Sequence, residues 1–125
     1  MSNGLTLDTG ALIALERRRA RVTRLVRRAV EDWLPTTVPV AVIAEWWRGR
    51  SDARDAVRRA IRIEAMDEAL ARAAGEALAA VSGATVVDAI VAASAARRGD
   101  VILTSDPRDL ERLAQYFGGL RVLAV

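Results

Sequence analysis

Four acidic residues are spaced along the chain so that they could form one carboxylate site. Asp8 ends the short segment Leu5-Thr6-Leu7-Asp8, which we interpret as a strand. Asp106 follows an apolar run at 101–103, with two hydroxyl residues between. Asp88 lies near the start of the segment 86–98, and Glu45 comes after the apolar run 40–44. Carboxylate oxygens are the ligands that Mg²⁺ and Mn²⁺ prefer. A metal ion held in this way can activate water for attack on a phosphodiester.

Each acid also has a structural interpretation when it is taken singly. Asp8 and Asp106 could each cap the helix that follows, which contributes about 1 kcal/mol. Asp88 lies three residues after a threonine, which is close to the spacing of a capping box. Glu45 has no capping role, and it could pair with Arg48, face water, or ligate a metal ion from a dry, apolar wall.

The residue types that are absent narrow the chemistry. The chain has no cysteine, no histidine and no lysine. Disulfides, thiol nucleophiles, Ser-His-Asp triads and histidine metal sites are therefore excluded. Schiff-base lysines and P-loop lysines are excluded as well. Catalysis, if there is any, must use carboxylates, hydroxyls and arginines, and clustered carboxylates usually surround a hard metal ion.

The basic residues favour an anionic partner. All 19 of them are arginines, and the net charge at pH 7 is +3. They are densest in one segment, which contains Arg17, Arg18, Arg19, Arg21, Arg24, Arg27 and Arg28. This segment has two interpretations: a solvated helix face, or a contact surface for phosphates or for an acidic partner.

The elements that must position the acids alternate between short strands and helices. We expect strands near 5–8, 36–38, 61–63, 101–103 and 120–125, with helices between them. The helix from about residue 22 should bury Val30 and Trp33, Asp52 should cap the helix that follows it, and Gly83 should end the helix that begins after Asp67. Such alternation predicts a parallel sheet with helices on both faces, whose carboxyl edge is where sites are built.

The length of 125 residues indicates a single domain spanning 1–125. The segment 1–6 lacks the basic and apolar regions of a signal peptide. The longest apolar run, 38–44, is too short to cross a bilayer. We therefore expect a cytoplasmic protein without a membrane partner.

The order of Asp8, Glu45, Asp88 and the segment Thr104-Ser105-Asp106 resembles that of the PIN-domain ribonucleases. The segments LDTGALIAL and VVDAIVAASAARRGDVILTSDPRDL resemble the VapC-type toxins of type II toxin–antitoxin pairs, and the resemblance covers essentially the whole chain. It implies a PIN-like three-layer α/β fold, with a five-stranded parallel sheet of order 3-2-1-4-5 and helices on both faces. It also implies an acidic Mg²⁺ pocket, endonucleolytic cleavage of RNA, an antitoxin that occludes the site, and a homodimer.

The resemblance assigns the catalytic and metal-binding carboxylates to four positions: Asp8, Glu45, Asp88 and Asp106. It assigns to Thr104 a hydrogen bond to a ligand or to the site water. Asp109 could be an outer ligand or an ordinary first-turn acid. Gly10 stands where the family commonly has serine, which removes one polar contact.

Other functions fit the sequence less well. A haloacid-dehalogenase-like phosphatase needs an aspartate where Gly10 stands and usually a lysine, and a receiver domain needs a lysine as well. The alternative that stays open is a non-catalytic PIN-like module that binds RNA or protein without Mg²⁺. Trp46 and Trp47 have three interpretations: core packing, a groove for an antitoxin helix, or base stacking.

Overall fold

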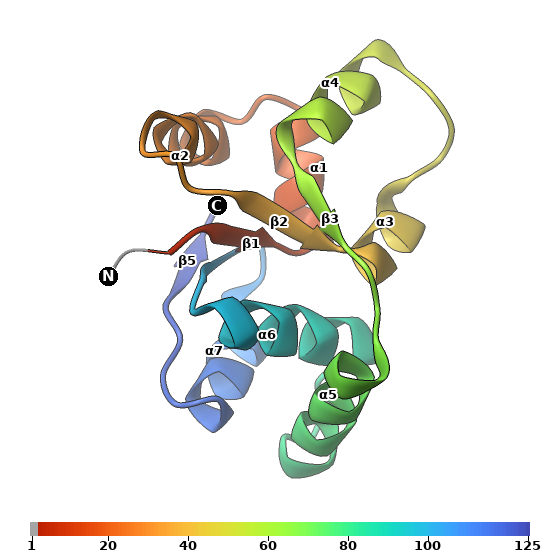
Figure 1. Ribbon diagram of the computed structural model, residues 1–125, viewed down its shortest axis with the longest axis vertical. Coiled ribbons are helices and arrows are strands. Elements are labelled where there is room, and N and C mark those ends of the chain that lie inside the picture. The colour runs from red at the N-terminus through yellow and green to blue at the C-terminus, as the bar shows by residue number, and fades with distance from the viewer. Residues whose placement is uncertain (1–2) are drawn as a thin grey trace.

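A five-stranded parallel sheet lies between two layers of helices in the computed structural model, which describes residues 3–125 (Figure 1). The strands are β1 (Leu5–Leu7), β2 (Thr36–Pro39), β3 (Arg62–Glu64), β4 (Val101–Thr104) and β5 (Val122–Ala124). The helices are α1 (Thr9–Glu16), α2 (Ala20–Glu31), α3 (Val40–Trp46), α4 (Asp52–Ala60), α5 (Glu68–Ala80), α6 (Val86–Arg98) and α7 (Pro107–Tyr116). The strand order is β3-β2-β1-β4-β5, which confirms the predicted fold class.

Each face of the sheet is covered by a different set of helices. Helices α1, α2 and α4 lie on one side of the sheet, and α5, α6 and α7 lie on the other (Figure 1). Helix α3 lies beside the carboxyl ends of β1 and β2 (Figure 1). The first two residues of the segment 1–6, for which we predict no signal peptide, lie outside the described residues. No helix among the described residues is both long and apolar enough to cross a membrane.

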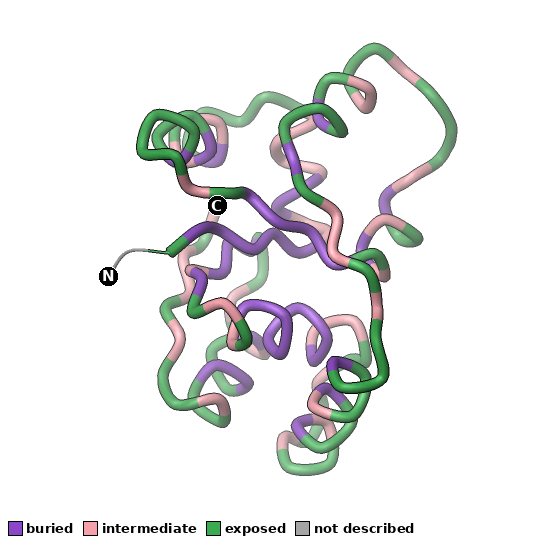
Figure 2. The backbone as a smooth tube through the Cα atoms, in the orientation of Figure 1, coloured by how far each residue is buried: buried purple, intermediate pink, exposed green. Residues whose placement is uncertain are grey.

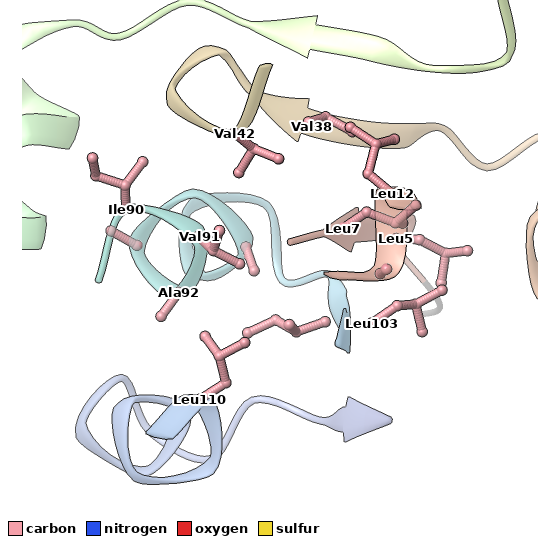
Figure 3. Close-up of a cluster of buried hydrophobic side chains, with 14 of the residues drawn as sticks. Leu5, Leu7, Leu12, Val38, Val42, Ile90, Val91, Ala92, Leu103 and Leu110 are labelled. Carbon is pink, nitrogen blue, oxygen red and sulfur yellow. The ribbon is translucent and has the colours of Figure 1, made fainter. Parts of the chain in front are cut away.

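The core is centred on β1 and α6 (Figure 2). Residues 89–95 of α6 are all buried, because α5 and α7 pack beside it and the sheet covers its remaining face. Small side chains make up most of this stretch, so the helix can approach its neighbours closely. Figure 3 shows Val91 of α6 near Leu7 of β1, with Leu110 of α7 completing the cluster. This packing holds the carboxyl ends of β1 and β4 in place.

Three details of the predicted helices are wrong. Val30 and Trp33 expose 62% and 93% of their surface. Val30 lies outside the buried face of α2, which consists of Val22, Val26 and Ala29, and Trp33 lies in the turn after the helix has ended at Glu31. Asp52 is the first residue of α4 and does not cap it; the hydroxyl of Ser51 accepts the capping hydrogen bond. Helix α5 ends at Ala80, before Gly83, since Val81 already has extended dihedral angles.

Helix α2 ends in a Schellman turn whose left-handed residue is a tryptophan. Trp33 has a φ of 58°, its N–H donates to the carbonyl of Val30 at 3.1 Å, and the N–H of Leu34 donates to the carbonyl of Ala29 at 2.8 Å. Glycine is the usual residue here because a side chain crowds the left-handed backbone. The structure therefore places a large, fully exposed aromatic residue at a position that disfavours it.

Candidate active site

The carboxyl ends of β1 and β4 bring Asp8 and Thr104 together. The two strands are adjacent and parallel, with Leu7 in register with Leu103. The N–H of Asp8 donates to the carbonyl of Leu103 at 3.2 Å, so the pairing continues to the end of the strand. Residues 96 positions apart in the sequence thus become neighbours at one edge of the sheet.

Asp8 is buried and accepts two hydrogen bonds. Its Oδ1 accepts from the N–H of Ala11 at 2.8 Å, which caps α1, and its Oδ2 accepts from the hydroxyl of Thr104 at 2.5 Å. Burial raises the pKa of Asp8, and the charges of Asp88 and Asp106 raise it further, while the two hydrogen bonds oppose this rise. The capping interpretation is therefore confirmed for Asp8, and the same carboxylate is coupled to two other predicted site acids.

Thr104 is fully buried and connects two of the acids. Its hydroxyl donates to Asp8 and accepts a hydrogen bond from the backbone N–H of Asp106 at 3.0 Å. A single hydroxyl thus fixes the Asp8 carboxylate and the start of the turn after β4. The hydrogen bond from Thr104 to a ligand stays a prediction.

Asp106 does not have the structural role that its position suggests. It precedes Pro107 at the start of α7, but its side chain makes no capping hydrogen bond to that helix. The side chain is exposed, and its charge raises the pKa of Asp8. Helix capping therefore does not explain Asp106, whereas proximity to Asp8 agrees with the site interpretation.

Asp88 lies in the first turn of α6 and joins the same group of charges. Its N–H donates to the hydroxyl of Thr85 at 3.1 Å, which is the capping arrangement that the sequence predicts. Its side chain is half-buried, and burial raises its pKa. The charges of Asp109 and Glu45 raise the pKa of Asp88 further. Asp109 is therefore close enough to the group to affect its ionisation.

Glu45 is exposed, so the predicted dry, apolar wall around it is wrong. Helix α3 buries Val42 and Trp46 and leaves Glu45 in solvent. The predicted ion pair with Arg48 is also wrong, since Arg48 donates to the carbonyls of two neighbouring residues instead. Glu45 accepts a hydrogen bond from the hydroxyl of Thr9 at 2.5 Å.

Thr9 is a site residue that the sequence reasoning missed. It directly follows Asp8, and its bond to Glu45 connects the start of α1 with α3. A hydroxyl residue next to a strand-end acid was a signal that could have identified it. Trp46 is buried, and its indole N–H donates to Glu16 at 2.7 Å, which confirms core packing for this residue.

Gly10 and Ser105 share one space beside the acids. A Cβ atom at position 10 would lie 1.9 Å from the Ser105 hydroxyl oxygen and 2.9 Å from its Cβ. Position 10 thus lacks the hydroxyl side chain that is common there in the family, but the side chain of Ser105, from the turn after β4, occupies the same space. The hydroxyl at this point of the site edge comes from Ser105.

The candidate ligands suit a hard cation by type, but their side chains are spread too far apart to hold one ion as they stand. Every candidate ligand is a carboxylate oxygen. The charges of Asp88 and Asp106 raise the pKa of Asp8, and those of Asp109 and Glu45 raise the pKa of Asp88. As the side chains stand, however, no three carboxylates within residues 3–125 are placed closely enough to hold one metal ion. Glu45 and Asp106 are exposed and Asp88 is half-buried, so their side chains have room to rotate.

Comparisons with known proteins identify the fold. The family model described as PIN domain matches residues 5–116. DNA-bound VapBC from Salmonella typhimurium is a structural relative with a TM-score of 0.72 and 19% identity, covering 98% of both chains. PAE2754 from Pyrobaculum aerophilum has a TM-score of 0.57 and 22% identity, over 98% of this chain and 92% of the other.

A third structural relative is FitAB bound to an IR36 DNA fragment, with a TM-score of 0.60 and 19% identity over 96% of this chain and 94% of the other. No curated protein matches the sequence.

Proposed function

Since this chain belongs to the PIN domain family, we propose that it is a Mg²⁺-dependent endoribonuclease acting as the toxin of a toxin–antitoxin pair. The observation that carries the proposal is the arrangement at the carboxyl ends of β1 and β4, where Thr104 donates to the buried Asp8 and accepts from the N–H of Asp106. The charges of Asp88 and Asp106 raise the pKa of Asp8, and a cation bound among ionised carboxylates removes their repulsion. Two of the structural relatives are the DNA-bound complexes VapBC and FitAB. Together with the resemblance of the sequence to VapC-type toxins, they support an antitoxin as the partner of this chain.

The residues that would hold the ion are Asp8, Asp88, Asp106 and Glu45. When bound, Mg²⁺ or Mn²⁺ lowers the pKa of a coordinated water and neutralises charge on the phosphodiester. Thr104 holds the Asp8 carboxylate through Oδ2, and Ala11 holds it through Oδ1, so this acid is pre-oriented. Thr9 restrains Glu45 in the same way. To complete the ligand set, the side chains of Asp88, Asp106 and Glu45 would have to turn toward Asp8, and Glu45 would have to release the Thr9 hydroxyl.

The choice of RNA as substrate rests on the family resemblance, because the proposed reaction uses water as the nucleophile and needs no 2′-hydroxyl. With the 3′-oxygen as the leaving group, the products carry a 5′-phosphate and a 3′-hydroxyl. Cleavage is expected in single-stranded loops, where bases are splayed out. We place the protein in the cytoplasm, as a homodimer that an antitoxin inactivates by covering the carboxylates.

The test measures cleavage of a mixed RNA pool by purified protein with Mg²⁺ or Mn²⁺, and then with EDTA. Asp106→Asn should lower the cleavage rate by more than about 100-fold, since even outer-shell changes at metal sites reduce activity 10- to 100-fold. Asp52→Asn is the matched control. It makes the same change in charge, but Asp52 is exposed on α4, away from the candidate site acids.

Calorimetry with Mg²⁺ or Mn²⁺ supplies a readout that does not depend on the RNA chosen. Wild-type protein should bind the ion, and Asp106→Asn should bind it more weakly. Cleavage that survives in Asp106→Asn would show that the carboxylates do not catalyse it. RNA binding without cleavage and without metal binding would favour the non-catalytic module.

A further inference from the structure

A groove of about 580 Å³ runs between α2 and the edge strand β5. The C-terminal end of the chain lies beside α2 in the same part of the molecule (Figure 1). Five arginines line this groove, which we call the arginine groove: Arg21, Arg24, Arg27, Arg28 and Arg121. One acid, Glu31, is among the lining residues. The groove therefore carries a large excess of positive charge.

The arginines are not simply a solvated helix face. Arg21, Arg24 and Arg28 follow the i, i+3, i+7 spacing of one stripe along α2, about 10 Å long at 1.5 Å per residue. Arg121 faces the same groove from the other wall, at the start of β5. Among the salt bridges formed within residues 3–125, only Arg28 of these residues takes part, with Asp32. Most of the charge is thus left for a partner.

The arginine groove continues toward the carboxylates. A second hollow of about 380 Å³ is lined by Gly10 and Ser105 at the site edge, and by Arg17 and Arg19 in the turn before α2. The two hollows are neighbours on two chain segments. Arg19 and Val125 line the second hollow, and Arg21 and Leu123, each two residues away in the sequence, line the first. A chain-like polyanion could follow this path.

Trp33 supplies an independent reason to expect a ligand here. It lies two residues beyond Glu31, which lines the arginine groove, and 93% of its surface is exposed. It occupies the left-handed position of a turn that glycine would form without strain. A strained and fully exposed aromatic residue contributes nothing to the core, and strained residues concentrate at functional positions.

We propose that the arginine groove binds the phosphates of a single RNA strand that extends from the carboxylate site, and that Trp33 stacks on one of its bases. Basic grooves with aromatic platforms are the general way in which proteins hold single strands. The assignment of RNA as the ligand rests on the proposed function. The succession of the two hollows, the second of which reaches Gly10 and Ser105 beside the acids, favours a nucleic acid strand over an acidic peptide, which becomes an outcome of the test.

The experiment measures binding of a single-stranded RNA 12-mer by fluorescence anisotropy, with EDTA and in an Asp106→Asn background, so that no RNA is cut. Arg24→Gln with Arg121→Gln should weaken binding on the order of tenfold at low salt. It should also reduce the slope of log K against log[salt] by about 1.4, since each phosphate contact on a single strand contributes about 0.7. Arg58→Gln with Arg59→Gln is the control, because it removes two exposed charges from α4, outside the groove.

Trp33→Gly separates binding from folding. It should weaken RNA binding several-fold while the melting temperature stays the same or rises, because glycine suits the left-handed turn. A purely structural role for Trp33 predicts the opposite for stability.

Each further outcome decides the proposal. Equal losses in the groove variant and the α4 control would mean that net charge alone attracts RNA, and would overturn it. Unchanged RNA binding in the groove variant, with lost binding of a polyglutamate peptide, would assign the groove to an acidic protein and overturn it. The wild-type protein could bind RNA without cutting it, while the groove variant binds it more weakly. That result would reject the proposed nuclease activity and support the RNA-binding role of the arginine groove.

Discussion

Replacing Thr104 by valine tests the link between the buried hydroxyl and the ionisation of Asp8. Valine keeps the shape of the fully buried side chain but removes the donor to Asp8 and the acceptor for the N–H of Asp106. A hydrogen bond to a charged group contributes about 1.5–3 kcal/mol, and a neutral one about 1 kcal/mol. We expect Thr104→Val to lower the free energy of unfolding at pH 7 by about 3 kcal/mol.

The loss should depend on pH in a defined direction. The bond from Thr104 lowers the pKa of Asp8, so its removal raises that pKa further. Because the pKa of Asp8 is raised above the ordinary 3.8, a larger fraction of the carboxyl is protonated at pH 4 than at pH 7, and the bond from Thr104 stabilises the protonated form less than the charged form. The variant should therefore lose about 1 kcal/mol less stability at pH 4 than at pH 7.

Urea unfolding at pH 4 and pH 7 measures the loss of stability at each pH, with Thr104→Ser as the matched control. Serine keeps the hydroxyl and removes one buried methyl, so its loss should be about 1 kcal/mol at either pH. In cleavage assays the acid limb of the rate profile should move to higher pH in Thr104→Val alone. Equal losses for the valine variant at pH 4 and pH 7, or equal losses for valine and serine, would refute the reasoning.

Two further predictions concern the neighbouring residues. Burial and nearby charges raise the pKa of Asp88, so the folded state holds its proton to higher pH than the unfolded state does, and stability falls as pH rises above about 4. Asp88→Asn should melt at a higher temperature than wild type at pH 7 but not at pH 3, and a thermal scan that shows no difference at pH 7 would contradict this. Gly10→Ala should destabilise the fold by about 1–2 kcal/mol through its contact with Ser105, and Ser105→Gly should relieve it. A double-mutant cycle in urea should give a coupling of about 1 kcal/mol, whereas additive losses would contradict the contact.

The sheet was predictable from the sequence because its determinants are local. Short apolar runs, helix starts with capping residues and the glycine after Arg98 each mark an element boundary, and the strand order is the one that the family resemblance implies. Asp8 and Asp88 were also placed correctly, since a strand end and a first helical turn set their positions.

The contacts between distant elements were not predictable. The orientation of Glu45 depends on which face of α3 is buried, and an apolar run of seven residues does not reveal that face. Arg98, the last residue of α6, has a side chain that is only 14% exposed and that pairs with Asp100 at 2.9 Å and with Glu64 of β3. By its spacing Trp33 would belong to the apolar face of α2. The turn that ends the helix has no glycine to mark it in the sequence, and it leaves Trp33 exposed to solvent.

The hydrogen bond between Thr104 and Asp8 joins residues 96 positions apart, and β4 lies inside the sheet between β1 and β5. During synthesis the first strand and its acid leave the ribosome long before the strand that completes the edge. A chain interrupted before residue 104 lacks Thr104 and Asp106, whatever else it has folded. Under the proposed function, translation that stops before residue 104 therefore releases fragments that lack two of the proposed site residues, and such fragments are expected not to cut RNA.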